Sequence, residues 1–181
     1  MKKSLIEYVI SIEEKDDLHI IRLIVLLQAL TGKKQNFSIE ISELAKLDFF
    51  LRYPIALQKA LSILKTSKMI EISETEKNNI EVKTLYFHYS PWNIKFRKLL
   101  KVMAARLLIS WNLKGRKVEV ELTTHAYSAL SEITDLEIFE NLRSQSKLIK
   151  THLSTLSQVK INSLINEILV ETTFANLGER L

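Results

Sequence analysis

Glycine and proline are scarce in this chain, with three glycines and two prolines among 181 residues. Both residues mark turns and end regular elements, so a chain with so few has few places to reverse direction. A fold of many short strands needs a turn every few residues and is therefore excluded. With 46% hydrophobic residues, the chain can bury a core, and extensive disorder is excluded as well. These features predict a mainly helical protein.

The absence of cysteine excludes a disulfide scaffold, thiolate zinc sites and a cysteine nucleophile. The start of the chain is basic, but Glu7 interrupts the apolar stretch that a signal peptide needs. Leu18 to Leu30 is the most apolar segment, yet it contains Arg22 and is too short to cross a bilayer. We therefore expect a cytoplasmic protein, with this segment as a buried core helix and no membrane partner.

The first half predicts three helices and a hairpin. A helix from near Asp17 to Leu30 ends at Gly32, a residue suited to a helix C-terminus. Pro54 marks a restart between two apolar helical stripes. The stripes are Ile41, Leu44, Leu47 and Phe50, then Ile55, Leu57, Leu61 and Leu64. Alternation in Met69 to Ser73 and again in Ile80 to Thr84 predicts a β-hairpin.

The second half repeats this plan in looser form. Ser90-Pro91 is a helix-start signal, followed by one apolar face. That face consists of Phe96, Leu99, Leu100, Met103 and Leu107. A second hairpin has its turn at Leu113 to Arg116, between the alternating residues Ile109, Trp111, Val118, Val120 and Leu122. Thr123 or Thr124 caps a helix through Leu130, and two more helices lie around Leu136 to Lys150 and Gln158 to Val170.

Repetition of helices followed by a hairpin suggests tandem winged-helix-like modules. The fold class is mainly α with two small β-hairpins. We expect a first module over residues 1–88, a second over 89–135, and C-terminal helices over 136–181. The repetition is architectural, because the sequence contains no exact internal repeat.

Positive charge gathers in the second module. Residues 91–122 hold eight basic and two acidic side chains, a net charge of +6, whereas the whole chain carries +5. One helix face and the second hairpin tip could together contact a phosphate backbone of double-stranded DNA. The candidate DNA-binding residues are Lys95, Lys98, Lys101, Arg106, Lys114, Arg116 and Lys117. The competing interpretation is a solvated helix face, on which lysine is common.

No pattern of catalytic or cofactor-binding residues is present. The histidines His19, His88, His125 and His152 do not have metal-ligand spacing, and the isolated glycines exclude a Walker-type phosphate loop. No nucleophile-elbow pattern accompanies the serines. We expect no catalytic, cofactor-binding or metal site, and hence a protein that is not an enzyme.

Two runs rich in aromatic residues are the candidate partner interface. The first run is Ala45-Lys46-Leu47-Asp48-Phe49-Phe50-Leu51-Arg52-Tyr53-Pro54, and the second is Tyr89-Ser90-Pro91-Trp92-Asn93. The partner candidates within them are Phe49, Phe50, Arg52, Tyr53 and Trp92. Large aromatic side chains favour either protein contacts or the interior of the fold, and both interpretations stand at this point.

These runs resemble the middle component of three-component ABC-ATPase conflict systems, including Lamassu-type anti-phage defence. The family's first run matches at Leu47, Asp48, Phe49, Arg52, Tyr53 and Pro54. Its second run matches at Tyr89, Pro91 and Trp92 but departs at Ser90 and Asn93, where the family has glycine and aspartate. The matched runs cover about a tenth of the chain, and the order of helices and hairpins extends the likeness.

The resemblance implies a non-catalytic adaptor or regulatory subunit that links an SMC-like ABC ATPase to an effector, often a nuclease. It also implies similarity to the tandem winged-helix accessory subunits of bacterial SMC complexes, with contact to double-stranded DNA through the complex. The alternative is a winged-helix transcriptional regulator, dimeric through the C-terminal helices. An interaction module from an unrelated complex also remains open, because fold does not determine function.

Overall fold

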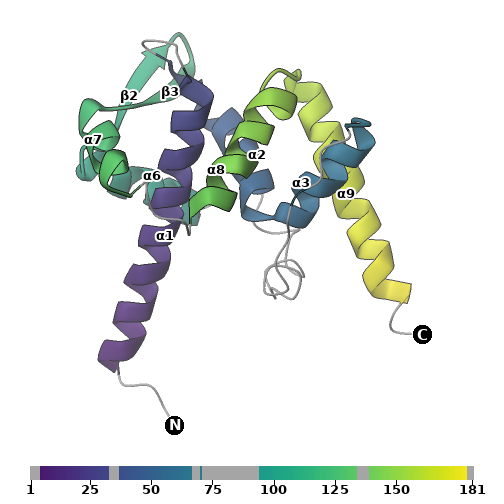
Figure 1. The fold of residues 1–181 in the computed structure, drawn as a ribbon, viewed down its shortest axis with the longest axis horizontal. Coiled ribbons are helices and arrows are strands. Elements are labelled where there is room, and N and C mark those ends of the chain that lie inside the picture. The colour runs from purple at the N-terminus through teal and green to yellow at the C-terminus, as the bar shows by residue number, and fades with distance from the viewer. Residues whose placement is uncertain (1–4, 33–36, 67–69, 71–93, 134–138, 179–181) are drawn as a thin grey trace.

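The protein is mainly helical with one small antiparallel sheet (Figure 1). The structure is a computed structural model that describes residues 5–32, 37–66, 70, 94–133 and 139–178, with side chains except in 5–15, 131–133 and 171–178. The helices are α1 (Leu5–Thr31), α2 (Ile41–Arg52), α3 (Pro54–Ile63), α6 (Ile94–Ala105), α7 (Thr124–Ile133), α8 (Glu140–Leu148) and α9 (Gln158–Gly178). A π-helical turn, Ile149–Leu153, continues α8. The predicted fold class is confirmed in this mainly helical form.

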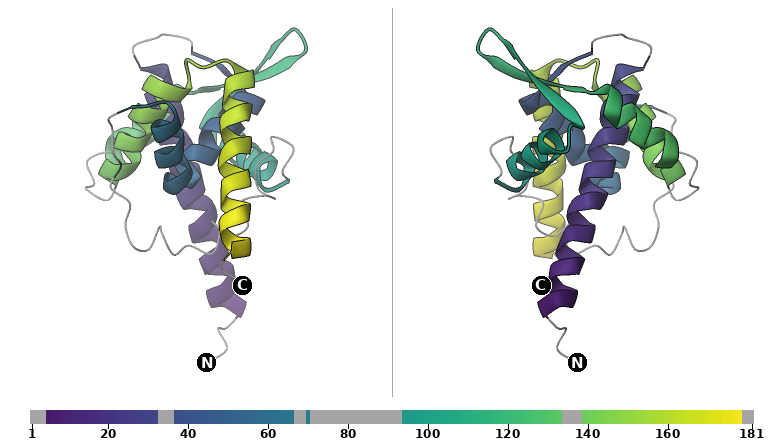
Figure 2. Two further views of the ribbon diagram at one scale, coloured as in Figure 1. Left: turned by 90° about the vertical axis from the view of Figure 1, so that its right-hand side faces the viewer. Right: turned by 90° about the vertical axis from the view of Figure 1, so that its left-hand side faces the viewer.

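Three strands form the sheet, in the order β1–β3–β2. They are β1 (Ile39–Glu40), β2 (Ile109–Lys114) and β3 (Lys117–Leu122), and both pairings are antiparallel. The second predicted hairpin is confirmed, and it projects beyond the helices (Figure 2). The first predicted hairpin, over 69–84, lies outside the described residues apart from Ile70. The described sheet takes one strand from residues 1–88 and two from 89–135, so it spans the two predicted modules.

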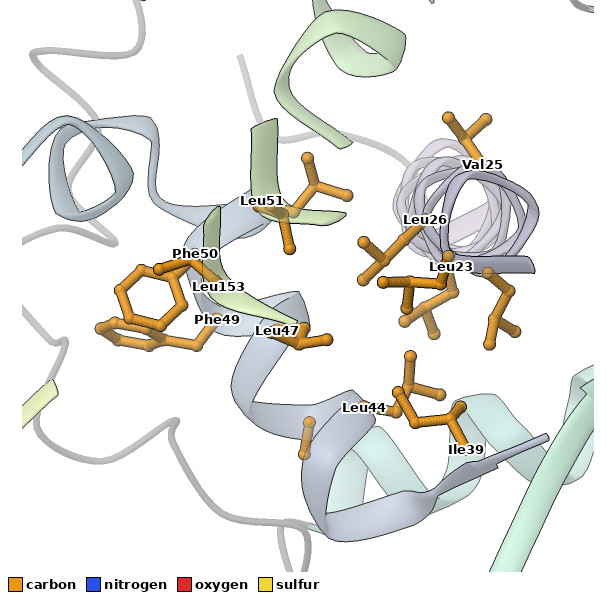
Figure 3. Close-up of a cluster of buried hydrophobic side chains, with 14 of the residues drawn as sticks. Leu23, Val25, Leu26, Ile39, Leu44, Leu47, Phe49, Phe50, Leu51 and Leu153 are labelled. Carbon is orange, nitrogen blue, oxygen red and sulfur yellow. The ribbon is translucent and has the colours of Figure 1, made fainter. Parts of the chain in front are cut away.

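Helix α1 is the central element of the core. It contacts α2, α6, α7, α8 and β3, which together surround its apolar middle. Leu23 and Leu26 of α1 face Leu44 and Leu47 of α2 in a fully buried layer (Figure 3). The apolar segment before Gly32 is therefore a core helix, as its composition predicts.

The predicted start of this helix near Asp17 is wrong, because α1 begins at Leu5. An aspartate inside a helix costs only some tenths of a kcal/mol, and no glycine or proline interrupts residues 5–31. Two ion pairs also favour the helical position of the acidic residues. Arg106 Nη1 lies 2.6 Å from Asp17 Oδ1, and Lys98 Nζ lies 3.6 Å from Asp16 Oδ2.

The end of α1 at Gly32 is confirmed. Gly32 has a φ of +57° and donates its N–H to the Gln28 carbonyl at 3.1 Å. The positive φ is the reason for glycine here, because a residue with a Cβ would be strained at this backbone angle.

Helical spacing predicts Leu107 on the buried face of α6, and this prediction is wrong. The helix ends at Ala105, and Leu107 takes a φ of +57° in the turn that follows. The N–H of Leu108 bonds to the Met103 carbonyl across this turn, which is the Schellman arrangement. The turn leaves Leu107 69% exposed, while Phe96, Leu99, Leu100 and Met103 are buried as predicted.

The other predicted boundaries within the described residues agree to within a few residues, except the end of α9. Thr123 caps α7, since its Oγ1 accepts the N–H of Ala126 at 3.2 Å. The helix runs to Ile133, three residues beyond the predicted Leu130, and α9 continues past Val170 to Gly178. The Ser90-Pro91 start signal lies outside the described residues. Pro54 begins α3, as expected.

A buried carboxylate joins α1 to α2. Asp48 is 3% exposed, and its Oδ1 accepts from Arg22 Nε at 2.9 Å. Arg22 Nη2 approaches Oδ2 at 3.4 Å, and Arg52 Nη2 lies 3.7 Å from the same oxygen. Burial alone would raise the pKa of Asp48, but the charges of Arg22 and Arg52 and the hydrogen bond from Arg22 outweigh burial and lower it.

Substitution of this carboxylate tests the network. Asp48→Asn leaves two half-buried guanidinium groups without their shared counter-charge, so urea unfolding at pH 7 should show a loss of about 3 kcal/mol in the free energy of unfolding. The matched control is Asp17→Asn, which breaks an ion pair that is about half exposed and should cost less than about 1 kcal/mol. Equal losses in the two variants would contradict the role of Asp48.

The same comparison has a defined pH dependence. The pKa of Asp48 in the folded protein lies below its ordinary value of 3.8, so its ionised form stabilises the fold. The advantage of the wild type over Asp48→Asn is therefore complete above roughly pH 5 and declines as the pH falls through the lowered pKa. Unfolding curves at pH 7, 5 and 4 measure this difference, which should not increase on acidification.

Candidate functional site

A groove with a volume of about 590 Å³ lies between α6 and the β2–β3 hairpin. Its floor is apolar and consists of Ile41, Leu100, Ala104, Trp111 and Val118. Its rim is cationic and consists of Arg97 and Lys101 of α6 and Arg116 and Lys117 at the hairpin tip. Glu40 and Ser42 complete the lining at the junction of β1 and α2. We call this feature the α6–hairpin groove.

Helical spacing produces one wall of the groove. Arg97 and Lys101 are four residues apart in α6, so they project from the same side of the helix. Leu100 and Ala104 repeat this spacing one position away and form the adjoining part of the floor. Since Leu100 is also fully buried, the wall is continuous with the hydrophobic core.

Strand alternation produces the other wall. Trp111 pairs with Val120 and Leu113 with Val118, so these four side chains share one face of the hairpin. Val120 is buried in the core, while Trp111, directly opposite it on β2, is 41% exposed. The hairpin turns at Gly115 and Arg116, where Gly115 takes a φ of +65°. The turn thus brings Arg116 and Lys117 to the rim.

One of the four rim cations has a carboxylate partner in the groove. Lys117 Nζ lies 2.7 Å from Glu40 Oε2, and Ser42 Oγ donates to Glu40 Oε1 at 2.5 Å. These hydrogen bonds lower the pKa of Glu40, and the pair raises the pKa of Lys117. Among the described residues, Lys101 and Arg116 have no ion-pair partner. The groove therefore keeps an excess of positive charge.

The seven predicted DNA-binding residues separate into two groups. Lys101, Arg116 and Lys117 line the α6–hairpin groove. The other four do not line the groove. Three of them form ion pairs: Lys98 with Asp16, Arg106 with Asp17, and Lys114 with Glu119 at 3.8 Å. Lys95 lies on the exposed surface of α6. Arg97 was missed, although its four-residue spacing from Lys101 would have identified it.

The predicted partner interface requires a larger correction. Phe49, Phe50 and Tyr53 are all buried, and Phe49 packs edge-on against Phe50 with ring centroids 5.2 Å apart (Figure 3). They belong to the core, so they offer no open surface to a partner. Arg52 is half-buried and faces Asp48. Trp92 lies outside the described residues.

Other kinds of site receive no support from the described part of the chain. Across residues 16–32, 37–66, 94–130 and 139–170, no three histidine, aspartate or glutamate side chains gather as a metal site. His19 lies beside Arg22, with Nδ1 2.6 Å from Nη1, in the network around Asp48. No described helix is both long enough and apolar enough to cross a membrane.

Comparisons with protein families, characterised proteins and solved structures find no match to this chain.

Ionic quenching of tryptophan fluorescence tests the groove. In a Trp92→Phe background Trp111 is the single tryptophan. The cationic rim should concentrate iodide near the ring and exclude caesium. The ratio of iodide to caesium quenching constants should therefore be about two- to threefold higher for Trp111 than for free N-acetyltryptophanamide at low ionic strength. Lys101→Gln with Arg116→Gln should remove most of this excess, while Lys160→Gln on α9 should leave it. A ratio in the parent protein equal to that of N-acetyltryptophanamide would contradict the geometry.

Proposed function

We propose that the protein is a non-catalytic adaptor subunit of a cytoplasmic SMC-like ATPase complex of the Lamassu anti-phage type. The observation that carries this proposal is the α6–hairpin groove. It combines an open apolar floor, an exposed tryptophan and a cationic rim, features that favour recognition of a protein partner. ATP hydrolysis and nucleic-acid cleavage then belong to the partners.

The family resemblance in residues 47–54 supports the proposal because the matched residues hold the core of the protein together. In this run Leu47, Phe49 and Tyr53 are core residues, and Asp48 forms the ion pairs between α1 and α2. A shared pattern at these positions therefore favours a shared fold more than a shared binding surface. The groove, on another part of the molecule, is the surface that we assign to partner contact.

An adaptor must contact two partners, and a second hollow of about 290 Å³ lies between α1 and α8. Arg143, Lys147 and Lys150 surround it, with Val25 and Ala29 of α1 at its apolar side. We assign the ATPase to the α6–hairpin groove. The hollow beside α8 is the candidate surface for the effector, for which a nuclease is the proposed class.

Contact with double-stranded DNA is the second candidate function. It is favoured by the position of α6 directly before a projecting hairpin (Figure 2). Arg116 and Lys117 lie at the turn of this hairpin, an arrangement by which a winged helix contacts a duplex. In the complex this contact would position the ATPase on DNA. If the protein acts without the complex, the same DNA contact would be that of a transcriptional regulator.

Purification of the tagged protein from its native host tests the adaptor function. After nuclease treatment at moderate salt, a large coiled-coil ATPase should remain bound in near-integral ratio, with an interface on the order of 1,600 Å² or more. Trp111→Ala should remove the ATPase, whereas Val159→Ala, an exposed apolar change on α9, should not. Recovery of the monomer alone would refute the proposal.

A salt titration tests the DNA candidate separately. If Lys101 and Arg116 contact phosphates, Lys101→Glu or Arg116→Glu should each reduce the slope of log affinity against log salt by about 1 on any duplex. Lys160→Glu, on the exposed side of α9, is the matched charge reversal. Unchanged slopes in the groove variants would refute DNA contact through the groove.

A further inference from the structure

The geometry points to an acidic amphipathic segment of a partner protein as the occupant of the α6–hairpin groove. In this arrangement apolar side chains of the segment lie on the groove floor, and its carboxylates meet the rim. The inference rests on the proposed adaptor function and specifies the chemistry of the partner at that site.

The apolar floor of the groove favours a ligand with apolar side chains. The apolar lining consists of Trp111 and Val118 of the hairpin, Leu100 and Ala104 of α6, and Ile41 of α2. Trp111 is 41% exposed, and the neighbouring Leu113 on the same hairpin face is 81% exposed. A tryptophan beside a preformed hollow is typical of the residues that contribute most to binding, because its large apolar area is covered on association.

The positive charges of the rim favour a ligand that carries negative charges beside its apolar side chains. Arg97 and Lys101 stand one helical turn apart on one side, and Arg116 stands on the hairpin side. Glu40 is engaged with Lys117, and among the described residues Lys101 and Arg116 have no ion-pair partner. A helix with acidic residues beside an apolar stripe complements this arrangement, since it can cover the floor and pair both rims at once.

The volume of the groove suits a few apolar side chains of such a segment. It is about 590 Å³, within the range of about 300–1,000 Å³ that small-molecule and cofactor sites occupy. A DNA duplex keeps its bases stacked inside, so it would place phosphates at the rim and leave most of the apolar floor uncovered. The floor therefore favours the acidic segment over a duplex.

Selection from random peptides tests the inference even while the partner is unidentified. The full-length protein is used to select from a displayed library of peptides of about 16 residues. The expected consensus has Leu, Ile, Phe or Trp at positions i, i+4 and i+7 with Asp or Glu between them. A neutral or basic consensus, or no enriched peptide, would overturn the inference.

Binding of the selected peptide is then measured by its own fluorescein anisotropy. Trp111→Ala and Lys101→Glu should each weaken binding at least about tenfold, and Lys160→Glu should leave it unchanged. A scrambled peptide of the same composition should bind at least about tenfold more weakly than the selected one. Because Lys101 is exposed on α6, Lys101→Glu remains informative even if Trp111→Ala fails to fold.

Competition with nucleic acid separates the outcomes. Excess peptide should prevent ATPase capture, while an unlabelled duplex or single strand should displace the peptide weakly. Stronger binding of either nucleic acid, dependent on Trp111 and Lys101, would overturn the inference in favour of a nucleic-acid groove.

If the ATPase copurifies but neither groove variant affects it, the adaptor function stands and the inference fails. If no ATPase copurifies while the peptide binds as expected, the adaptor function fails instead.

Discussion

The buried carboxylate of Asp48 is the interaction on which the described arrangement depends. It receives Arg22 from α1 and faces Arg52 on its own helix, so it ties the central helix to α2 in a region where an isolated charge would be costly. Strand β1 leads directly into α2 and pairs with β3, so the position of α2 also sets that of the hairpin. The groove between α6 and the hairpin is thus a consequence of contacts made inside the core.

The sequence predicts the elements whose signals are local. Apolar spacing identified the buried faces of α2 and α6, and Gly32, Pro54 and Gly115 marked where the chain ends a helix, restarts one or turns. It did not predict β1, because two residues are too short for a periodic pattern. It also misplaced Leu107, since helical spacing cannot show that the helix stops two residues earlier in a left-handed turn.

The candidate site was predicted only in part, for a physical reason. Clustering of basic residues in the sequence identified the region of α6 and the hairpin, yet it could not separate paired cations from unpaired ones. Arg106 is bound by Asp17, which is 89 positions away in the sequence. The aromatic residues show the same limit, because Phe49 and Phe50 enter the core while Trp111, far along the chain, stays partly exposed. Both distinctions are made by tertiary packing.

Site-specific photocrosslinking in the native host tests the central claim, that the α6–hairpin groove receives a protein partner. A photoreactive residue replaces Leu113 beside the groove in one variant and Val159 on α9 in the other, where the native side chains are 81% and 79% exposed. The account predicts that the Leu113 variant crosslinks to an acidic segment of a coiled-coil ATPase and that the Val159 variant does not. Crosslinks from Leu113 to nucleic acid, or equal crosslinking from both positions, would contradict it.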